Sequence, residues 1–427
     1  MKSKSIQRAR TAVAVTAAKA ATVASRATGR GAGGMIGGLV AGFIAPSLME
    51  NLAAGRPVSI VTGTNGKSTT TRMLTAAMRT TSTVCSNEGG DNMDAGIISA
   101  LLEGRGAERV VLEVDELHVP AAADKLDADC LVLLNLSRDQ LDRVGEINTI
   151  ERRLRECVQA RPEMTVVANC DDVMVTSVAF DHPNVVWVAA GAGWTGDSTS
   201  CPRTGSHIVR SEDGVDWCAT KPLADGHQFR RPAPDYWLEG EDLVTPQGRF
   251  SLSLQLPGNA NRGNAAQAVA AAVTGGADTQ KAVDAVGQVK EVAGRYSTIE
   301  FEGRQVHMLL AKNPAGWQEA LSMVDRSADG LVIAVNGQVA DGEDLSWLWD
   351  VKFEDFDDVA VVAAGERGTD LAVRLTYASI EHELVKNTLD AIRACPPGRV
   401  EVLANYTAFR DLKRDLAKAS ARTAEEA

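Results

Sequence analysis

Short apolar runs alternate with helix-like runs from Val58 to about Ala190. The apolar runs are rich in Val, Leu and Ile, and they are Ser59–Val61, Thr83–Cys85, Arg109–Val114, Cys130–Leu134, Thr165–Ala168 and Val185–Val188. This alternation is typical of a doubly wound, mostly parallel sheet. We therefore expect an α/β fold over this part of the chain.

The pattern changes twice further along. Residues 191–240 are rich in Gly, Asp, Pro and Trp, which predicts an inserted β-rich module, and an alternating stretch over 244–256 and an alanine-rich helix over 258–273 follow it. Near Gly294 the pattern restarts with the strand-like runs Thr298–Phe301, Val306–Leu310, Leu331–Val335, Val359–Ala363 and Val400–Leu403. A helix around 380–394 and a charged helix over 407–426 complete this second α/β domain. We therefore expect three parts: a basic, glycine-rich amino-terminal segment over 1–50, a central domain over 51–293 that contains the insertion 191–240, and a carboxy-terminal domain over 294–427.

The first 49 residues contain no acid and carry Lys2, Lys4, Arg8, Arg10, Lys19, Arg26 and Arg30 among many alanines. An organellar transit peptide has this composition, and so does a basic helix lying on an anionic membrane. A plain helix packed on the body of the protein is the third interpretation. Gly29 to Gly42 is glycine-rich and predicts a loop, and Pro46 to Ala54 predicts a short helix.

The composition narrows the function classes. The chain has 427 residues, 44% hydrophobic and 23% charged, as in a globular protein with more than one domain. Its net charge of −12 argues against nucleic acid as a partner. Seven cysteines without a secretory signal indicate a reducing compartment. No apolar run approaches the roughly 20 residues that span a bilayer.

A phosphate-binding loop is predicted between Ser59 and Thr70, where β-formers lead into Thr62-Gly63-Thr64-Asn65-Gly66-Lys67-Ser68-Thr69. A strand, a glycine-containing turn and a helix start place backbone N–H groups around a nucleotide triphosphate such as ATP. Lys67 would reach the β- and γ-phosphates, and the Ser68 hydroxyl would bind Mg²⁺. The alternative is an ordinary glycine turn, which does not require Lys-Ser at the helix start. The candidate nucleotide-binding residues are Gly63, Thr64, Asn65, Gly66, Lys67, Ser68 and Thr69.

Two further strand ends carry polar residues. Glu113 and Glu116 follow an apolar strand, at the edge where ligands bind in such sheets. Either acid could complete an Mg²⁺ site with Ser68, or it could belong to a solvated turn. The stretch from Asn135 to Arg143 is polar directly after another strand.

With these motifs laid out, the chain resembles the MurT family, the Mur-ligase-like subunits of lipid II isoglutaminyl synthases. The resemblance covers nearly the whole chain and rests on the following stretches: Thr62–Thr70, Leu112–Glu116, Asn135–Arg143, Asn169-Cys170-Asp171-Asp172, Gly258–Asn264, Ala311–Gly316 and Ala340–Asp350. Ordinary Mur ligases have histidines where this chain has Gln140, Val144 and Lys312. A domain that holds UDP also precedes the loop in those enzymes, whereas here only the basic, glycine-rich segment does.

The resemblance implies an ATP-dependent ligase of peptidoglycan biosynthesis. ATP would phosphorylate the α-carboxyl of D-glutamate in the lipid II stem peptide, and ammonia would convert the acyl phosphate to D-isoglutamine. Lys67, Glu113 and Lys312 would act at the reacting phosphate or carboxylate, and Arg295 would contribute positive charge. Asn261 and Asn264 resemble adenine contacts, with helix N-capping as the alternative.

A glutaminase partner is implied as the ammonia source, because free ammonia is mostly protonated at neutral pH and no cysteine here lies in a glutaminase-type motif. The resemblance implies a heterodimer with a GatD-like subunit, in which Asp350 orients the partner's histidine as a triad acid does. Trp347 and Trp349 beside it would be either core or interface residues.

Zinc is doubtful. Relatives often carry a zinc ribbon in the insertion, but Thr204 and Thr220 stand where second cysteines would be, which leaves Cys201 and Cys218. Cys85, Cys130, Cys157, Cys170 and Cys395 are predicted to be buried as small hydrophobes.

Two other functions stay open at this point: a stand-alone Mur- or folylpolyglutamate-synthetase-type amino-acid ligase, and an ATP-binding scaffold without turnover. For the amidating ligase, we expect a cytoplasmic protein that is peripheral to the inner face of the cell membrane, where lipid II lies.

Overall fold

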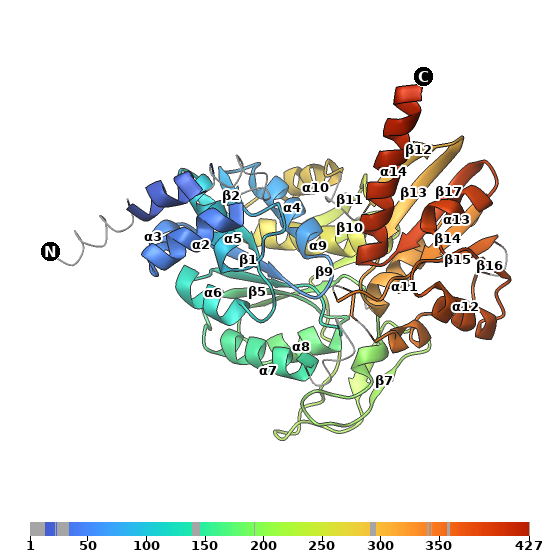
Figure 1. Ribbon diagram of the computed structural model, residues 1–427. Coiled ribbons are helices and arrows are strands. Elements are labelled where there is room, and N and C mark those ends of the chain that lie inside the picture. The colour runs from blue at the N-terminus through green and yellow to red at the C-terminus, as the bar shows by residue number, and fades with distance from the viewer. Residues whose placement is uncertain are drawn as a thin grey trace. The chain divides into compact units, whose positions relative to one another are not determined.

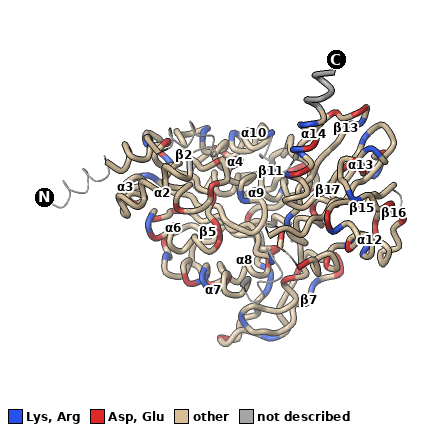
Figure 2. The backbone as a smooth tube through the Cα atoms, viewed as in Figure 1, with Lys and Arg blue, Asp and Glu red and all other residues tan. Residues whose placement is uncertain are grey.

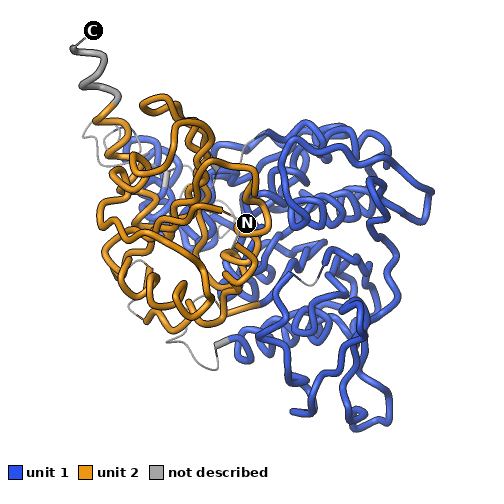
Figure 3. Tube along the Cα trace, turned by 90° about the vertical axis from the view of Figure 1, so that its right-hand side faces the viewer, with its two compact units in different colours: residues 1–136, 147–290 blue, residues 137–146, 291–427 orange. Residues whose placement is uncertain are grey.

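A computed structural model describes residues 13–21, 23, 34–138, 146–191, 193–290, 296–339, 341–342, 344–356 and 359–426 (Figure 1). The chain divides into two compact units, which Figure 3 colours separately. Unit 1 comprises Met1–Leu136 and Ile147–Lys290, and unit 2 comprises Ser137–Glu146 and Glu291–Ala427. The sequence-based boundary between residues 293 and 294 lies outside the described residues and stays a prediction.

Unit 1 is built on a nine-stranded sheet with the order β11-β10-β9-β6-β5-β4-β1-β3-β2. The bounds are β1 Val58–Thr62, β2 Val84–Ser86, β3 Arg109–Glu113, β4 Cys130–Leu133, β5 Thr165–Asn169, β6 Val185–Ala189, β9 Tyr236–Glu239, β10 Asp242–Thr245 and β11 Gly248–Ser251. Neighbouring strands from β2 across to β9 are parallel, whereas β9, β10 and β11 pair antiparallel. The prediction of a mostly parallel α/β sheet is confirmed.

Helices cover both faces of this sheet, because its parallel strands are apolar on both sides. In β1, Val58 and Ile60 join one hydrophobic cluster and Val61 joins the other. The Val61 cluster includes residues of α4 (Lys67–Met78), α9 (Asn259–Thr274) and α10 (Thr279–Gly287). The other cluster includes residues of α3 (Leu48–Ala53), α5 (Asp94–Glu103), α6 (Val119–Leu126), α7 (Glu146–Gln159) and α8 (Val173–Ala179).

The insertion contains a small sheet of its own. β7 (Ile208–Arg210) and β8 (Trp217–Ala219) pair antiparallel, after a short 3-10 turn at Gly196–Ser198. Trp217 and Phe229 are buried there with ring centroids 5.2 Å apart. The insertion ends by joining the main sheet, since β9 pairs with β6.

Unit 2 has a six-stranded sheet with the order β12-β13-β17-β14-β15-β16, in which only the β12–β13 pair is antiparallel among the described strands. Its strands are β12 Tyr296–Phe301, β13 Arg304–Leu310, β14 Gly330–Ala334, β15 Val361–Ala364, β16 His382–Leu384 and β17 Gly398–Ala404. Its helices are α11 Pro314–Met323, α12 Gly368–Tyr377, α13 Thr388–Ala394 and α14 Tyr406–Glu426, with a 3-10 turn η2 at Ser346–Trp349.

Two sequence-based expectations are wrong. The segment from Gly34 is not a loop but the helix α2 (Gly34–Ile44), which packs on α5. A Cβ atom on Gly38 would lie 1.8 Å from the carbonyl oxygen of Ala95, so glycine permits a close approach that offsets its helix cost of about 1 kcal/mol. The helix expected over 380–394 is instead strand β16 followed by α13, whose start is capped by the Asn387 side chain.

No helix among the described residues is long and apolar enough to cross a membrane.

Candidate active site

The loop between β1 and α4 contains two glycines in backbone conformations that other residues rarely adopt. Gly63 and Gly66 have φ angles of 143° and 86°, in the region that favours glycine. A Cβ on Gly63 would lie 2.8 Å from Leu134 Cβ, and one on Gly66 would lie 2.6 Å from Asn264 Oδ1. Thus each glycine is required both by its φ angle and by a close neighbour.

Asn135, directly after β4, holds the loop in this shape. Its carbonyl oxygen accepts a hydrogen bond from Thr64 N at 2.9 Å, and its side-chain Oδ1 accepts one from Asn65 N at 2.9 Å. Its Nδ2 donates to the carbonyl oxygen of Asn65 at 3.0 Å. The sequence marked Asn135 as polar at the sheet edge, but this bracing role emerges only from the pairing of β4 with β1.

Lys67, the first residue of α4, is held over the loop. Its Nζ donates to the carbonyl oxygen of Gly63 at 2.6 Å and lies 3.2 Å from Glu116 Oε2. The two side chains are only 13% and 10% exposed. A largely buried ion pair holds the ammonium group at the place where the loop would bind phosphates.

Glu113 differs from Glu116 in having a carboxylate oxygen without a hydrogen-bond partner. Its Oε1 accepts a hydrogen bond from Asn92 Nδ2 at 3.0 Å, whereas its Oε2 is buried and has no hydrogen-bond partner in the described structure. Asn87 fixes the Glu113 backbone through bonds to both its N–H and its carbonyl. A buried carboxylate oxygen without a donor is costly, and a hard cation such as Mg²⁺ would satisfy it.

Ser68 lies on the same edge of the sheet as Glu113. Glu113 is paired in register with Val61 on the neighbouring strand, two residues before Gly63. A Cβ on Gly90, in the loop that also contains Asn87, would lie 3.9 Å from Ser68 Oγ. The residues present therefore fit a magnesium site that includes Ser68 and Glu113, and Glu116 is committed to Lys67.

Asn264 packs against the loop, and Asn261 does not. Asn264 is buried beside Gly66, whereas Asn261 is partly exposed and donates from Nδ2 to the carbonyl oxygen of Pro257 at 2.6 Å. The capping residue of α9 is Gly258, with no side-chain capping bond. The alternative interpretation of these two asparagines as helix caps is therefore wrong.

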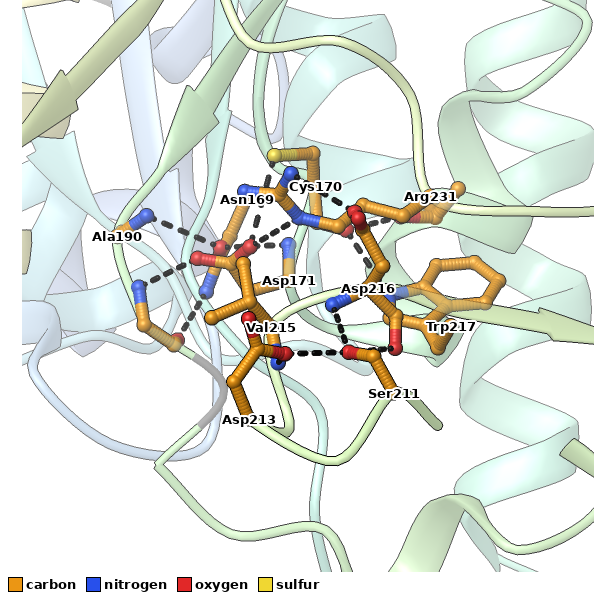
Figure 4. Close-up of polar contacts among 12 residues, drawn as sticks. Asn169, Cys170, Asp171, Ala190, Ser211, Asp213, Val215, Asp216, Trp217 and Arg231 are labelled. Carbon is orange, nitrogen blue, oxygen red and sulfur yellow. Dashed lines mark hydrogen bonds and ion pairs between the residues drawn. The ribbon is translucent and has the colours of Figure 1, made fainter. Parts of the chain in front are cut away.

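A pocket with polar and apolar lining residues opens beyond the carboxyl ends of β5 and β6, and Figure 4 shows the polar contacts of Asp171 and Arg231 in its lining. Its volume is about 670 Å³, and its lining includes Asp171, Gly191, Arg231, Trp237, Asn259 and Arg262. Arg231 Nε donates to Asp171 Oδ1 at 2.6 Å, and Gly191 N donates to Asp171 Oδ2 at 2.7 Å. Arg231 comes from the insertion, so the insertion supplies one wall of this pocket.

The role of Arg231 is not predictable from the sequence pattern, because Asp171 and Arg231 are 60 residues apart and nothing in the pattern links them. The run Asn169-Cys170-Asp171-Asp172 was the available signal. Asn169 donates from Nδ2 to the carbonyl oxygens of Leu134 and Gly191, at 3.1 and 3.0 Å, and so ties β4 to the loop after β6.

The predicted site residues of unit 2 lie in two places. Lys312 is exposed, and its Nζ lies 5.5 Å from the centroid of the Tyr406 ring. Asp350 follows the 3-10 turn η2, and its Oδ2 lies 3.3 Å from Arg138 Nη2, with both side chains about one-third exposed. Arg295 lies outside the described residues, as do Gln140 and Val144.

The two tryptophans before Asp350 have opposite surroundings. Trp347 is buried and stacks on Trp317 with ring centroids 5.3 Å apart. Trp349 is 55% exposed and lies edge-on to Tyr377, which is 73% exposed. Trp347 is thus a core residue, and Trp349 with Tyr377 forms an exposed aromatic pair next to Asp350.

The cysteines are mostly buried. Cys85, Cys130, Cys157, Cys170, Cys201 and Cys395 are buried, and Cys218 is partly exposed. Burial raises the pKa of the Cys130 thiol to about 12 and that of Cys395 to about 11. Within the described residues, no group of three or more Cys, His, Asp or Glu side chains is placed to hold a metal ion. Low zinc content stays a prediction.

We expect a thiol reagent to modify Cys218 quickly in the folded protein and the six buried cysteines only after unfolding. The measurement is a thiol titration with and without denaturant. Cys218→Ser should remove the fast phase. Two or more fast thiols in the wild-type protein would contradict the burial of the others.

Two family models match the chain. The Mur ligase middle domain matches residues 61–272, which contain the loop and the pocket, and the MurT ligase C-terminal domain matches residues 310–409. The chain is 28% identical over 399 residues to the lipid II isoglutaminyl synthase (glutamine-hydrolyzing) subunit MurT of Streptococcus pneumoniae, covering 87% of this chain and 89% of that protein. It is 26% identical over 352 residues to the subunit of the same name from Staphylococcus aureus, covering 77% and 79%.

Solved structures share the fold. A pseudomurein peptide ligase type C from Methanothermus fervidus matches with a TM-score of 0.67 at 16% identity, over 86% of this chain and 79% of that one. MurF from Acinetobacter baumannii matches with a TM-score of 0.64 at 16% identity, over 89% and 80%. The loop, the parallel sheet and the two family matches lead to one assignment: the chain belongs to the Mur ligase family, in the MurT group that carries this C-terminal domain.

Proposed function

We propose that this chain is the ligase subunit of a glutamine-hydrolysing lipid II isoglutaminyl synthase. It would use ATP to amidate the α-carboxyl of D-glutamate in the lipid II stem peptide. The observation that carries the proposal is the loop with Lys67 paired to buried Glu116, in a chain with a MurT-type C-terminal domain. The two MurT relatives carry the corresponding enzyme name.

The reaction needs one activation and one substitution. A carboxylate oxygen attacks the γ-phosphorus of ATP, ADP leaves, and an acyl phosphate forms. Ammonia then attacks the acyl carbon, the carbon–oxygen bond to phosphate breaks, and a proton is lost to give the amide. Phosphoryl transfer depends mainly on positioning and charge neutralisation. Lys67, with Gly63 and Gly66 shaping the loop, would provide both.

Magnesium would be held by Ser68 and Glu113. When bound it would neutralise charge on the phosphate oxygens. The unpartnered Glu113 Oε2 supports this assignment, and so does the commitment of Glu116 to Lys67. The roles of the two acids are therefore proposed to differ: Glu113 faces the cation, and Glu116 positions the lysine.

The nucleoside of ATP would occupy the side of the loop toward Asn264 and the pocket. Asn264 already contacts Gly66, and the pocket lies beyond the strand ends of the same sheet, where nucleotides bind in doubly wound folds. Thr64, Asn65 and Thr69 would contribute to the phosphate cradle, and Asn261 would need to give up its bond to Pro257 to reach the base. Lys312 and Arg295 would act on the anionic substrate.

Ammonia would come from a glutaminase subunit. Six of the seven cysteines are buried, and burial raises the pKa of the thiols of Cys85, Cys130, Cys157, Cys170 and Cys395, which disfavours the thiolate form that a nucleophile requires. We propose that the partner docks over the exposed pair Trp349 and Tyr377, since exposed aromatic residues are typical interface anchors. Asp350, adjacent to that pair, would then face the partner's histidine.

The place of action would be the membrane surface, because the substrate is lipid-linked. The protein would be cytoplasmic and peripheral to the inner face of the membrane.

The nitrogen donor tests the proposal against its alternative, an amino-acid ligase. The purified chain with its co-purified partner, ATP and lipid II should release ADP with glutamine or with ammonium salt, and the product should carry an amide. An amino-acid ligase would instead release ADP with an amino acid and add a whole residue to the substrate. A scaffold would show no substrate-dependent ADP release at all.

A further inference from the structure

Helix α2 has its small residues inside and its large apolar residues outside. Gly37, Gly38 and Ala41 are buried. On the outward side, Phe43 is 90% exposed and Leu39 is 59% exposed, and Met35 and Ile36 are 43% and 39% exposed. A helix on the surface of a globular domain normally has the reverse arrangement, with its apolar face toward the core.

The inner contacts fix this orientation. A Cβ on Gly38 would lie 1.8 Å from the Ala95 carbonyl oxygen, and one on Gly42 would lie 3.0 Å from Ile98 Cδ1, so α2 lies directly on α5. Rotating the helix to bury Leu39 and Phe43 would put those side chains where only glycine fits. Met35, Leu39 and Phe43 follow each other at four-residue spacing and thus form one stripe, the outward face of α2.

This face is accompanied by positive charge. α2 itself has no charged residue, as its uniformly tan tube in Figure 2 shows. The first 49 residues carry seven Lys and Arg and no acid, in a chain whose net charge is −12. Residues 13–21 are helical, and their Ala14 and Ala18 belong to the same core cluster as Ala41 of α2, with Lys19 exposed. The helix over residues 13–21 is therefore anchored in the core that supports α2.

We propose that the outward face of α2 docks this protein on an anionic lipid bilayer. Leu39 and Phe43 would enter the boundary between headgroups and acyl chains, and the positive charge that the first 49 residues carry would attract the chain to anionic headgroups. With 11 residues, α2 lies in the interface and does not span the membrane. The positive charge favours an anionic lipid surface over other apolar partners. An apolar stripe alone would fit any apolar partner, but a stripe next to a chain segment with only positive charge fits a negatively charged lipid surface.

This inference deepens the proposed place of action at the membrane and rests on it, but it does not depend on the amidation chemistry. Different measurements test the ligase function and the membrane docking, so either proposal can fail without the other. Loss of the ligase function would appear in ADP release with a lipid-free, water-soluble stem-peptide substrate. Loss of docking would appear in vesicle binding with no substrate present.

The test is co-sedimentation of the full chain with its partner on two kinds of vesicle: phosphatidylcholine alone, and phosphatidylcholine mixed with phosphatidylglycerol. We expect binding to the mixed vesicles, weaker binding to the neutral ones, and loss of the difference at high ionic strength. Leu39→Ser and Phe43→Ser should each lower the partition coefficient roughly tenfold, since each removes the burial of one large apolar side chain.

Val373→Ser is the matched control, because Val373 is also an exposed helical apolar residue, 48% exposed on α12 of unit 2. It should leave vesicle binding unchanged, and all three variants should keep the wild-type melting temperature. Vesicle binding that is equal in the wild type and the Leu39→Ser/Phe43→Ser double variant would overturn the proposal. So would a wild type that ignores vesicles while the double variant loses its protein partner, because the face would then be a protein interface.

Discussion

Lys67→Ala is expected to abolish substrate-dependent ADP release and amidation, with a loss of at least about 10³ in rate. The ammonium group lies on the loop at 2.6 Å from the Gly63 carbonyl and would neutralise the transferring phosphoryl group. Alanine leaves that charge without a counterion. The measurement is ADP release at saturating lipid II and glutamine, compared with wild type.

The same variant also leaves Glu116 as a buried carboxylate without its cation, which costs several kcal/mol of stability in such pairs. The control is therefore Lys67→Met/Glu116→Gln, which removes both charges and keeps the volume. This double variant should recover the melting temperature and stay inactive. A folded variant without Lys67 that turns over normally would remove this lysine from the reaction.

Asp350→Asn is expected to lower glutamine-driven amidation strongly while leaving ammonia-driven amidation close to wild type. Replacing a triad acid by its amide costs on the order of 10⁴ in rate in serine proteases. The ligase chemistry would use Lys67, Ser68 and Glu113, which are unchanged. Stability should change little, because the Asp350–Arg138 pair is about one-third exposed and such pairs contribute about 0–1 kcal/mol.

Two neighbours make this measurement specific. Arg138→Met breaks the ion pair but keeps the Asp350 carboxylate, so glutamine-driven activity should survive if the carboxylate is what matters. Asp344→Asn removes an acid that accepts a hydrogen bond from Ser346 N at 2.8 Å, and it should have little effect. Equal loss of glutamine-driven and ammonia-driven activity in Asp350→Asn would place Asp350 in the ligase chemistry or the fold. No loss in either would end its proposed role.

Asp341, another acid near Asp350 in the chain, already has structural partners. It accepts hydrogen bonds from the backbone N–H and the hydroxyl of Thr407. Its side chain ties the loop after β14 to the start of α14, so it is poorly placed to serve a partner as well. This leaves Asp350 as the better candidate of the two.

Local patterns predicted the strands and the glycine turn between β1 and α4 well, because both depend on short stretches of sequence. Apolar runs such as Cys130–Leu134 could only be buried strands in an alternating α/β pattern, and Gly63 and Gly66 with Lys67 and Ser68 define the loop by their own chemistry. The roles of individual acids could not be predicted. Glu113 and Glu116 are three residues apart and chemically alike, and only the folded chain shows that one binds Lys67 and the other keeps a free oxygen.

Features that depend on contacts between distant residues could not be predicted from local sequence patterns. α2 was expected to be a loop because glycine disfavours helices, yet its glycines are what allow α2 to approach α5. The pairing of Arg231 with Asp171 joins the insertion to the main sheet across 60 residues. In both cases tertiary packing decided the structure, and local preference did not.

The central claim is that this chain activates a carboxylate through an acyl phosphate. Oxygen transfer tests it most directly: lipid II labelled with ¹⁸O at both oxygens of the α-carboxyl of its D-glutamate is turned over with ATP and glutamine, and the released phosphate is analysed by mass. The carboxylate oxygen that attacks the γ-phosphorus stays on the phosphate when ammonia displaces it, so one ¹⁸O atom should appear in each phosphate. Amidated product accompanied by phosphate without ¹⁸O would contradict the proposed mechanism.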